Sequence, residues 1–195
     1  MGIEDFAAPE RTNMHRLTLR AGLYRAFPQA LAESGVSWGE CYHADFGDGV
    51  LVLVPADYPK AVFSELVPSA LAASLAEHNR SSQPSERIRL RLVLHAGEVS
   101  YDAHGTTGCA LVHAFRLLNS GVLKKAMAYS GGDLALIASA WYREEIIRHS
   151  PLSRPDRYHP VVVQEKETTA RAWIRIVGPD ESRHGGPWRD DRALG

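Results

Sequence analysis

Residues 47–55 read GDGVLVLVP, an aspartate between two glycines that is followed at once by a run of aliphatic residues. Glycines are typical of a position where the chain reverses, and the aliphatic run over 50–54 predicts a strand covered on both faces. Together with 38–44 on the other side of the turn, this stretch predicts a β-hairpin. Asp48 is then either a plain turn residue or a metal ligand on the hairpin. If it is a ligand, the rest of the chain should supply the other residues that a metal site needs.

Hydrophobic spacing outside the hairpin predicts further helices and strands. A helix is expected from 14 to 33, capped by Thr12 and Asn13, kinked at Pro28 and ended by Gly35. The alternation over 88–94 predicts a strand with one buried face, and 104–108 predicts a glycine-rich loop. The other predicted helices cover 58–79, 110–118, 122–128 and 141–148, and the other predicted strands cover 134–138, 158–164 and 172–176.

Composition limits the classes of protein to which the chain can belong. With 195 residues, of which 45% are hydrophobic, it is long enough for one well-buried core. We therefore expect one domain over 1–176 and a disordered tail over 177–195. The 22 basic and 23 acidic residues nearly cancel, which argues against a nucleic-acid partner. Only Cys41 and Cys109 are present, and no apolar stretch is long enough to span a bilayer, so we expect a cytoplasmic protein with no membrane partner and reduced thiols.

The order of these elements predicts an α+β fold. It would complete a ferredoxin-like βαββαβ core if one strand preceded the first helix. Only residues 2–6 are available there, so the opening strand is expected to be short or missing. Its absence would leave an unpaired edge within the sheet. Residues 1–7 could extend further than expected, a neighbouring chain or the tail could fill the gap, or native residues could precede Met1.

Three stretches, taken together, resemble a known family. They are GDGVLVLVP (47–55), RLRLVLHAGEV (89–99) and GTTGCALVHAFRLL (105–118). In this order and spacing they resemble the catalytic domain of class III nucleotidyl cyclases, the adenylate and guanylate cyclases, in their compact actinobacterial branch. The resemblance covers about residues 1–176 and implies a ferredoxin-like core with additional helices and strands. It also implies a nucleoside triphosphate ligand, and a homodimer or a heterodimer with another cyclase-like chain that shares the active sites.

The resemblance assigns metal chemistry to the hairpin. Two divalent ions, Mg²⁺ or Mn²⁺, activate the attacking 3′-hydroxyl and stabilise the leaving pyrophosphate in such enzymes. Asp48 matches the second metal aspartate, but the place of the first holds Gly2. Two nearby carboxylates are candidate replacement ligands, each in an imperfect position: Glu4 shares the face of Gly2 but is displaced along the strand, and alternation along an extended chain points Asp5 to the opposite face. Gly47 would line the cofactor site with the two glycines Gly49 and Gly108.

The helix predicted over 110–118 departs from the family pattern. Arg116 matches an arginine that stabilises charge on the phosphate, but the asparagine expected four residues earlier is Val112. His113 is an imperfect replacement, because it points about 100° away around the helix. Arg116 is equally interpretable as a structural arginine that pairs with a neighbour. His95, in the preceding strand, is expected to be a hydrogen-bonded core histidine.

Base selection and phosphate binding also lack clear residues. The positions that the family uses to select adenine or guanine hold Ala44 and Gly105, neither of which can read a purine edge. Lys166 is the nearest match to a lysine that steadies the phosphates. It is equally interpretable as a solvated lysine between Glu165 and Glu167.

Two hypotheses about function remain. The chain is either a catalytically degenerate cyclase-homology domain that regulates nucleotide signalling by binding a nucleotide or a partner protein, or an active cyclase that makes a 3′,5′-cyclic nucleotide. The substitutions at Gly2 and Val112 favour the first hypothesis, since losing one preorganised donor typically costs about 10²- to 10³-fold in rate. The second hypothesis requires replacement ligands such as Glu4 or His113, or a partner protomer.

Overall fold

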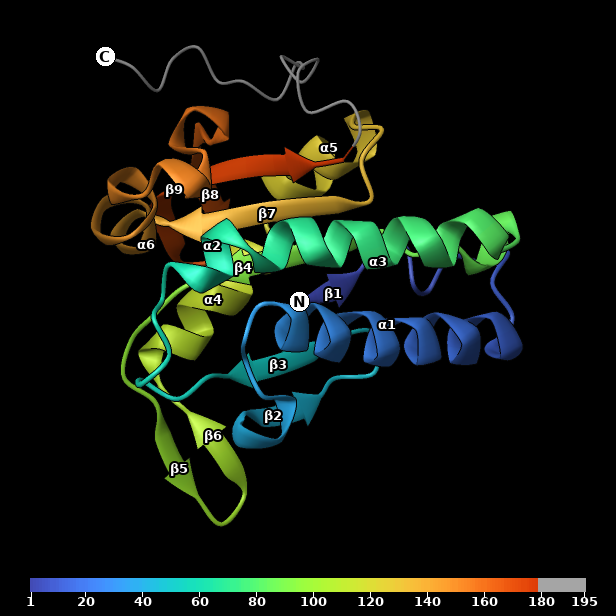
Figure 1. The fold of residues 1–195 in the computed structure, drawn as a ribbon, viewed down its shortest axis with the longest axis horizontal. Coiled ribbons are helices and arrows are strands. Elements are labelled where there is room, and N and C mark those ends of the chain that lie inside the picture. Colours follow the sequence, from blue (N-terminus) through green and yellow to red (C-terminus); the bar gives the residue numbers. More distant parts are fainter. Residues whose placement is uncertain (179–195) are drawn as a thin grey trace.

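Residues 1–178 are described in a computed structural model of the chain. They form an α+β fold in which helices cover both faces of a mixed sheet (Figure 1). The helices are α1 (Asn13–Glu33), α2 (Val62–Glu65), α3 (Val67–Ser81), α4 (Cys109–Asn119), α5 (Gly121–Tyr129) and α6 (Ala140–Glu145). The strands are β1 (Gly2–Ile3), β2 (Tyr42–Asp45), β3 (Val50–Leu53), β4 (Leu90–Leu94), β5 (Ser100–Asp102), β6 (Gly105–Thr107), β7 (Leu134–Ser139), β8 (His159–Glu165) and β9 (Thr168–Val177). Short 3-10 turns lie at Trp38–Glu40, Pro84–Glu86, Ile147–His149, Pro151–Ser153 and Pro155–Arg157.

The main sheet has five strands in the order β1-β4-β7-β9-β8. β4 and β7 are parallel, and the other neighbours are antiparallel. The predicted hairpin is present as β2 and β3, and a single antiparallel bridge between Gly2 and Gly49 connects it to β1. The short strand β1 therefore lies between β3 on one side and β4 on the other.

The opening strand is short, as the sequence predicts. β1 comprises Gly2 and Ile3, and backbone hydrogen bonds of Met1 with Val50 and of Glu4 with Arg89 extend its pairing by one residue at each end. The Ile3 amide donates to the Asp48 carbonyl at 2.8 Å, and the Val50 amide donates to the Met1 carbonyl at 3.1 Å. The sheet is thus closed around β1, although only over this short length.

Two hydrophobic clusters lie on opposite faces of the sheet. The larger contains α1 and α3, which lie side by side in Figure 1, and includes Leu23 and Leu75 against Leu92 of β4. The smaller contains α4 and α5 and includes Leu117 against Ile137 of β7. Because β4 and β7 have helices on both faces, side chains on both faces of these central strands are buried.

The first helix forms as the sequence predicts. Its N-terminus is capped by Thr12, whose side chain accepts a hydrogen bond from the His15 amide, while the His15 ring accepts one from the Thr12 amide. Pro28 lies inside the helix. Gly35 follows its end with φ of +77°, a conformation that favours glycine.

Several predictions of local structure are wrong in detail. The run over 50–54 is only half-buried beyond Val50, because no strand of residues 1–178 pairs with the β1 side of β3 past Met1. β4 has both faces buried and not one, and the predicted loop over 104–108 is part of the β5–β6 hairpin. The helix predicted over 58–79 is divided at Leu66, directly before Val67 and Pro68.

The end of the chain differs slightly from the prediction. β9 continues to Val177, one residue beyond the predicted domain boundary, because Val177 pairs with Leu134 of β7. The rest of the predicted tail, from residue 179 on, lies outside the described residues. None of the helices in residues 1–178 is long and apolar enough to cross a bilayer.

Candidate functional site

The glycines of the hairpin have backbone roles. Gly47 has φ of +86°, which a residue with a side chain rarely adopts. A Cβ atom on Gly49 would lie 2.2 Å from the Met1 carbonyl oxygen, so only glycine permits the close approach of β1. The Gly-Asp-Gly sequence is therefore explained by the turn and by strand packing. Between these glycines, Asp48 is exposed, and its carbonyl accepts the bond from Ile3.

The hairpin is held against α1 by a cluster that the sequence analysis missed. The Asp45 carboxylate lies 2.7 Å from the Arg20 guanidinium and accepts hydrogen bonds from the Tyr24 hydroxyl at 2.5 Å and the Gly47 amide at 2.8 Å. The hydrogen bond from Arg20 is the main cause that lowers the Asp45 pKa to about 2. Arg20 and Tyr24 are four residues apart on a helix, but no sequence pattern indicates their partner 21 to 25 residues away.

Gly2, the position at which the resemblance expects the first metal ligand, lies next to an arginine. Gly2 pairs with Arg91 across β1 and β4, and a Cβ atom on Gly2 would lie 3.8 Å from Arg91 Nη2. Arg91 Nε also lies 2.5 Å from Glu4 Oε2. These two atoms are buried and form an ion pair without good hydrogen-bond geometry. Glu4, the candidate replacement ligand, is therefore neutralised by a buried cation.

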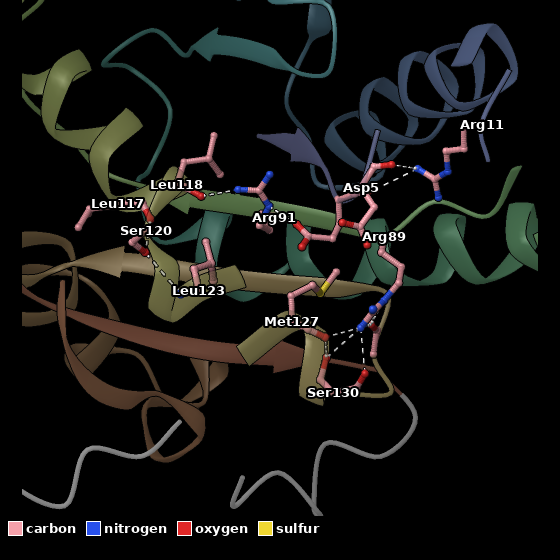
Figure 2. Close-up of polar contacts among 12 residues, drawn as sticks. Asp5, Arg11, Arg89, Arg91, Leu117, Leu118, Ser120, Leu123, Met127 and Ser130 are labelled. Atoms are coloured by element: carbon pink, nitrogen blue, oxygen red, sulfur yellow. Dashed lines mark hydrogen bonds and ion pairs between the residues drawn. The ribbon is translucent and has the colours of Figure 1, made fainter. Parts of the chain in front are cut away.

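Arg91 also binds the end of a helix. Its Nη1 donates to the Leu118 carbonyl at 2.8 Å, near the C-terminus of α4 (Figure 2). Arg89 acts in the same way at the end of α5, where it donates to the Ser130 carbonyl at 2.9 Å. Figure 2 shows both guanidinium groups pointing toward the ends of these helices. The two arginines satisfy carbonyls that have no partner within the helix and lie at the negative end of each helix dipole.

Asp48 and Glu4 do not form a divalent-metal site with other acidic or histidine ligands. No group of three or more such residues, or cysteines, is close enough to hold a metal ion within residues 1–178. Two Mg²⁺ or Mn²⁺ ions would need at least two free carboxylates, and the Glu4 carboxylate is occupied by Arg91. The residues present do not fit the two-metal arrangement that the resemblance implies.

The helix α4 presents the other candidate residues. Gly108 caps its N-terminus with φ of +148°, and a Cβ there would lie 2.9 Å from the Glu98 carbonyl oxygen. Val112 is exposed on this helix. Arg116 Nη2 lies 2.5 Å from the Glu167 carboxylate in the β8–β9 turn. This contact is the structural pairing that the sequence analysis left open as an alternative to phosphate binding.

His113 lies beside a second histidine. Its ring centroid is 4.9 Å from that of His95, and His95 Nδ1 is 2.9 Å from the Ser139 hydroxyl oxygen. The His95 pKa is lowered to about 4, mainly by burial of the ring and to a smaller extent by the charge of His113. Burial also lowers the pKa of His113. Both rings are therefore neutral near pH 7, and the hydrogen bond expected for His95 is present.

The predicted site residues fall into two separate groups. Asp48, Glu4 and the hairpin glycines gather around β1, whereas His113, Arg116 and Lys166 lie on α4 and in the β8–β9 turn. Lys166 is exposed and has φ of +52° in this turn. No hydrogen bond or ion pair joins the two groups within the part of the chain that the structure describes. Arg91, whose side chain contacts both Glu4 of the β1 segment and the end of α4, is a residue to which the sequence analysis assigned no role.

Comparison of the chain with protein-family models and with curated proteins finds no match. The resemblance to class III cyclases therefore rests on the three sequence stretches quoted above.

Proposed function

We propose that the chain is a class III nucleotidyl-cyclase-homology domain that regulates by binding and does not cyclise a nucleoside triphosphate. The arrangement of its first half supports the homology. β1, α1, β2, β3, the short helix α2, α3 and β4 follow one another along the chain, and the strands are adjacent in the order β4-β1-β3-β2. This strand order, with α1 and α3 on one face, is the one expected of a ferredoxin-like βαββαβ unit and supports the proposed homology.

The observation that carries the proposal is the ion pair between Arg91 and Glu4 beside Gly2. Two-metal catalysis needs carboxylates to gather positive ions at this position. Arg91 is itself a positive charge there, fixed by Glu4 and by the end of α4. A divalent ion near Asp48 would find the Glu4 carboxylate already paired with this guanidinium and would have one free carboxylate as its protein ligand.

The helix α4 supports the same conclusion. Val112 cannot donate a hydrogen bond to a ribose or a phosphate. The side chain of Arg116 is only 18% exposed and is paired with Glu167, so binding a triphosphate would require this ion pair to break. These contacts favour partner binding over nucleotide binding as the role of the domain.

The proposal is tested by incubating the purified protein with each of the four common nucleoside triphosphates and Mn²⁺ or Mg²⁺. Mass spectrometry should find no cyclic product, and the triphosphates should leave the melting temperature unchanged. A melting shift without a product would assign nucleotide binding to the domain. A cyclic nucleotide that disappears in Asp48→Ala would contradict the proposal and identify an active cyclase.

A further inference from the structure

A cavity of about 720 Å³ lies between β3 and β4, directly beyond Met1. Val52 and Val54 line it from the side of β3, and Val93 and Leu94 from the side of β4. Phe27 of α1 and Ala114 of α4, which belong to the helices on opposite faces of the sheet, also line it. The volume is within the range of about 300 to 1,000 Å³ that is typical of ligand sites. Because β3 and β4 line its two sides, the cavity lies where a further strand of the sheet could fit, and we call it the inter-strand groove.

The backbone groups on both sides of the groove are arranged to pair with a strand. On β3 the Val50 amide and carbonyl bond to Met1, so by alternation those of Val52 face the groove. On β4 the Arg89 carbonyl accepts a hydrogen bond from the Glu4 amide, whereas the Leu90 amide donates on the β7 side. Because the sides alternate along the strand, the amide and carbonyl of Val93 lie on the same side as those of Arg89 and face the groove. Within residues 1–178 no strand pairs with either residue on this side.

The side chains around the groove define what could fill it. Leu92 and Leu94 point into the cluster that contains Phe27, whereas Val93 packs on the other face against the cluster of α4 and α5. The lining from α4 includes the small residues Ala110 and Ala114, which leave room for larger side chains. An occupant that continues the line of β1 would therefore meet apolar surface on both faces, as a central strand does.

We propose that the inter-strand groove binds a short, continuously apolar strand of a partner polypeptide, antiparallel to both β3 and β4. The backbone groups favour a peptide over other apolar ligands, because only a peptide offers alternating donors and acceptors to both edges. β3 offers Leu51 to Leu53, and β4 offers Val93 and Leu94, beyond the residues that β1 already pairs. At about 3.3 Å per residue, three to four inserted residues match this length. This inference deepens the partner-binding half of the proposed function, on which it rests.

The test uses the full chain and a synthetic peptide with acetylated and amidated ends. Its core is Val-Ile-Val-Ile, with lysines on both sides for solubility. Titration calorimetry should detect binding, and the amides of Val52 and Val93 should exchange at least tenfold more slowly when the peptide is present. In two control peptides, N-methyl groups replace the amide hydrogens at odd or at even core positions, which removes the donors to one edge at a time. Each should bind at least tenfold more weakly.

Variants of the chain locate the peptide. Ala114→Phe fills the groove and should abolish binding, whereas Val112→Phe adds the same ring to an exposed position of α4 and should not. A chain that carries Val-Ile-Val-Ile directly before Met1 should fill the groove itself and should no longer bind the peptide. This variant keeps the test valid if Ala114→Phe does not fold.

Four outcomes would overturn the proposal. The first is equal binding of the N-methylated peptides, which would indicate a general apolar ligand site. The second is unchanged exchange at Val52 and Val93 with the unmodified peptide, and the third is undiminished binding of the peptide to the extended chain. The fourth is protection of these amides without peptide that depends on protein concentration, which would indicate a second copy in the groove. No nucleotide is used, so this test and the triphosphate test can fail separately.

Discussion

At the scale of the residue, small side chains decide how β1 enters the sheet. Gly49 lets the Met1 carbonyl approach to hydrogen-bonding distance of Val50, and Gly2 leaves space beside Arg91. Asp45 performs a different task, since it ties the hairpin to Arg20 and Tyr24 of α1. The conspicuous Asp48 has a less defined role, because its side chain is exposed at the end of the turn.

Replacing Gly49 by alanine should destabilise the protein. The added Cβ would lie 2.2 Å from the Met1 carbonyl oxygen and 3.0 Å from the Gly2 Cα, and both are backbone atoms that move only if β1 moves. We expect a loss of about 1 to 3 kcal/mol in the free energy of unfolding, measured by urea denaturation. Gly39→Ala is the matched control, since the nearest atom is 3.9 Å away, and its effect should remain within about 0.5 kcal/mol. Equal effects of the two substitutions would contradict this account of the glycine.

At the scale of the element, buried arginines connect strands to helix ends. Arg91 joins β1 to β4 through Glu4 and joins β4 to α4 through the Leu118 carbonyl. Arg89 connects β4 to the end of α5 through Ser130. Because helix termini leave carbonyls without partners, each arginine replaces water at a site where the helix meets the sheet.

Removing one partner of the Arg91–Glu4 pair should cost more than removing both. Arg91→Met leaves the Glu4 carboxylate buried without its cation, and breaking a buried pair in this way typically costs about 3 to 5 kcal/mol. Adding Glu4→Gln should recover a measurable part of that loss, with a coupling energy of at least about 1 kcal/mol in a double-mutant cycle. Urea denaturation of the two single variants and the double variant gives the cycle. Additive effects would show that the two side chains do not interact.

At the scale of the whole molecule, the short strand β1 is what connects the β2–β3 hairpin to the five-stranded sheet. Beyond Met1 the sheet opens into the inter-strand groove, which His95, Trp141 and Tyr142 also line. β4 has helices on both faces and β3 packs into the cluster of α1 and α3, although no strand of residues 1–178 fills the space between the two strands.

The stability of the protein should fall as the pH falls from about 6.5 to about 4. In the folded chain the His95 pKa is lowered from 6.5 to about 4, so the unfolded chain binds more protons over this interval. Proton binding to the unfolded state favours unfolding, so the contribution of neutral His95 is fully present above pH 6.5 and is lost toward pH 4. The lowered pKa of His113 acts in the same direction.

Urea denaturation at several pH values between 4 and 7 measures this effect. The slope of stability against pH should be smaller in His95→Asn, and the difference between the wild-type and variant slopes separates the histidine from the carboxylates that titrate nearby. His104→Asn, at an exposed position of the β5–β6 hairpin, controls for removing a histidine elsewhere. An unchanged slope in His95→Asn would show that this ring does not govern the acid sensitivity.

The sequence by itself determined the elements whose causes are local. The cap at Thr12, the hairpin at Gly47 and the apolar runs of β4 and β7 each follow from spacing, turn chemistry and hydrophobic period, and all are present in the structure. It also determined that β1 is short. The burial of both faces of β4 was predicted wrongly, because which helices cover a strand is decided by the chain as a whole.

Only the tertiary structure decided the contacts that give the candidate site its character. The pairing of Arg91 with Glu4, of Arg116 with Glu167 and of Asp45 with Arg20 joins residues 25 to 87 positions apart. An ion pair over such a separation depends on the positions of whole strands and helices, which no local pattern encodes. The inter-strand groove is likewise a property of two edges that lie apart in the sequence and are held at a distance by the helices around them.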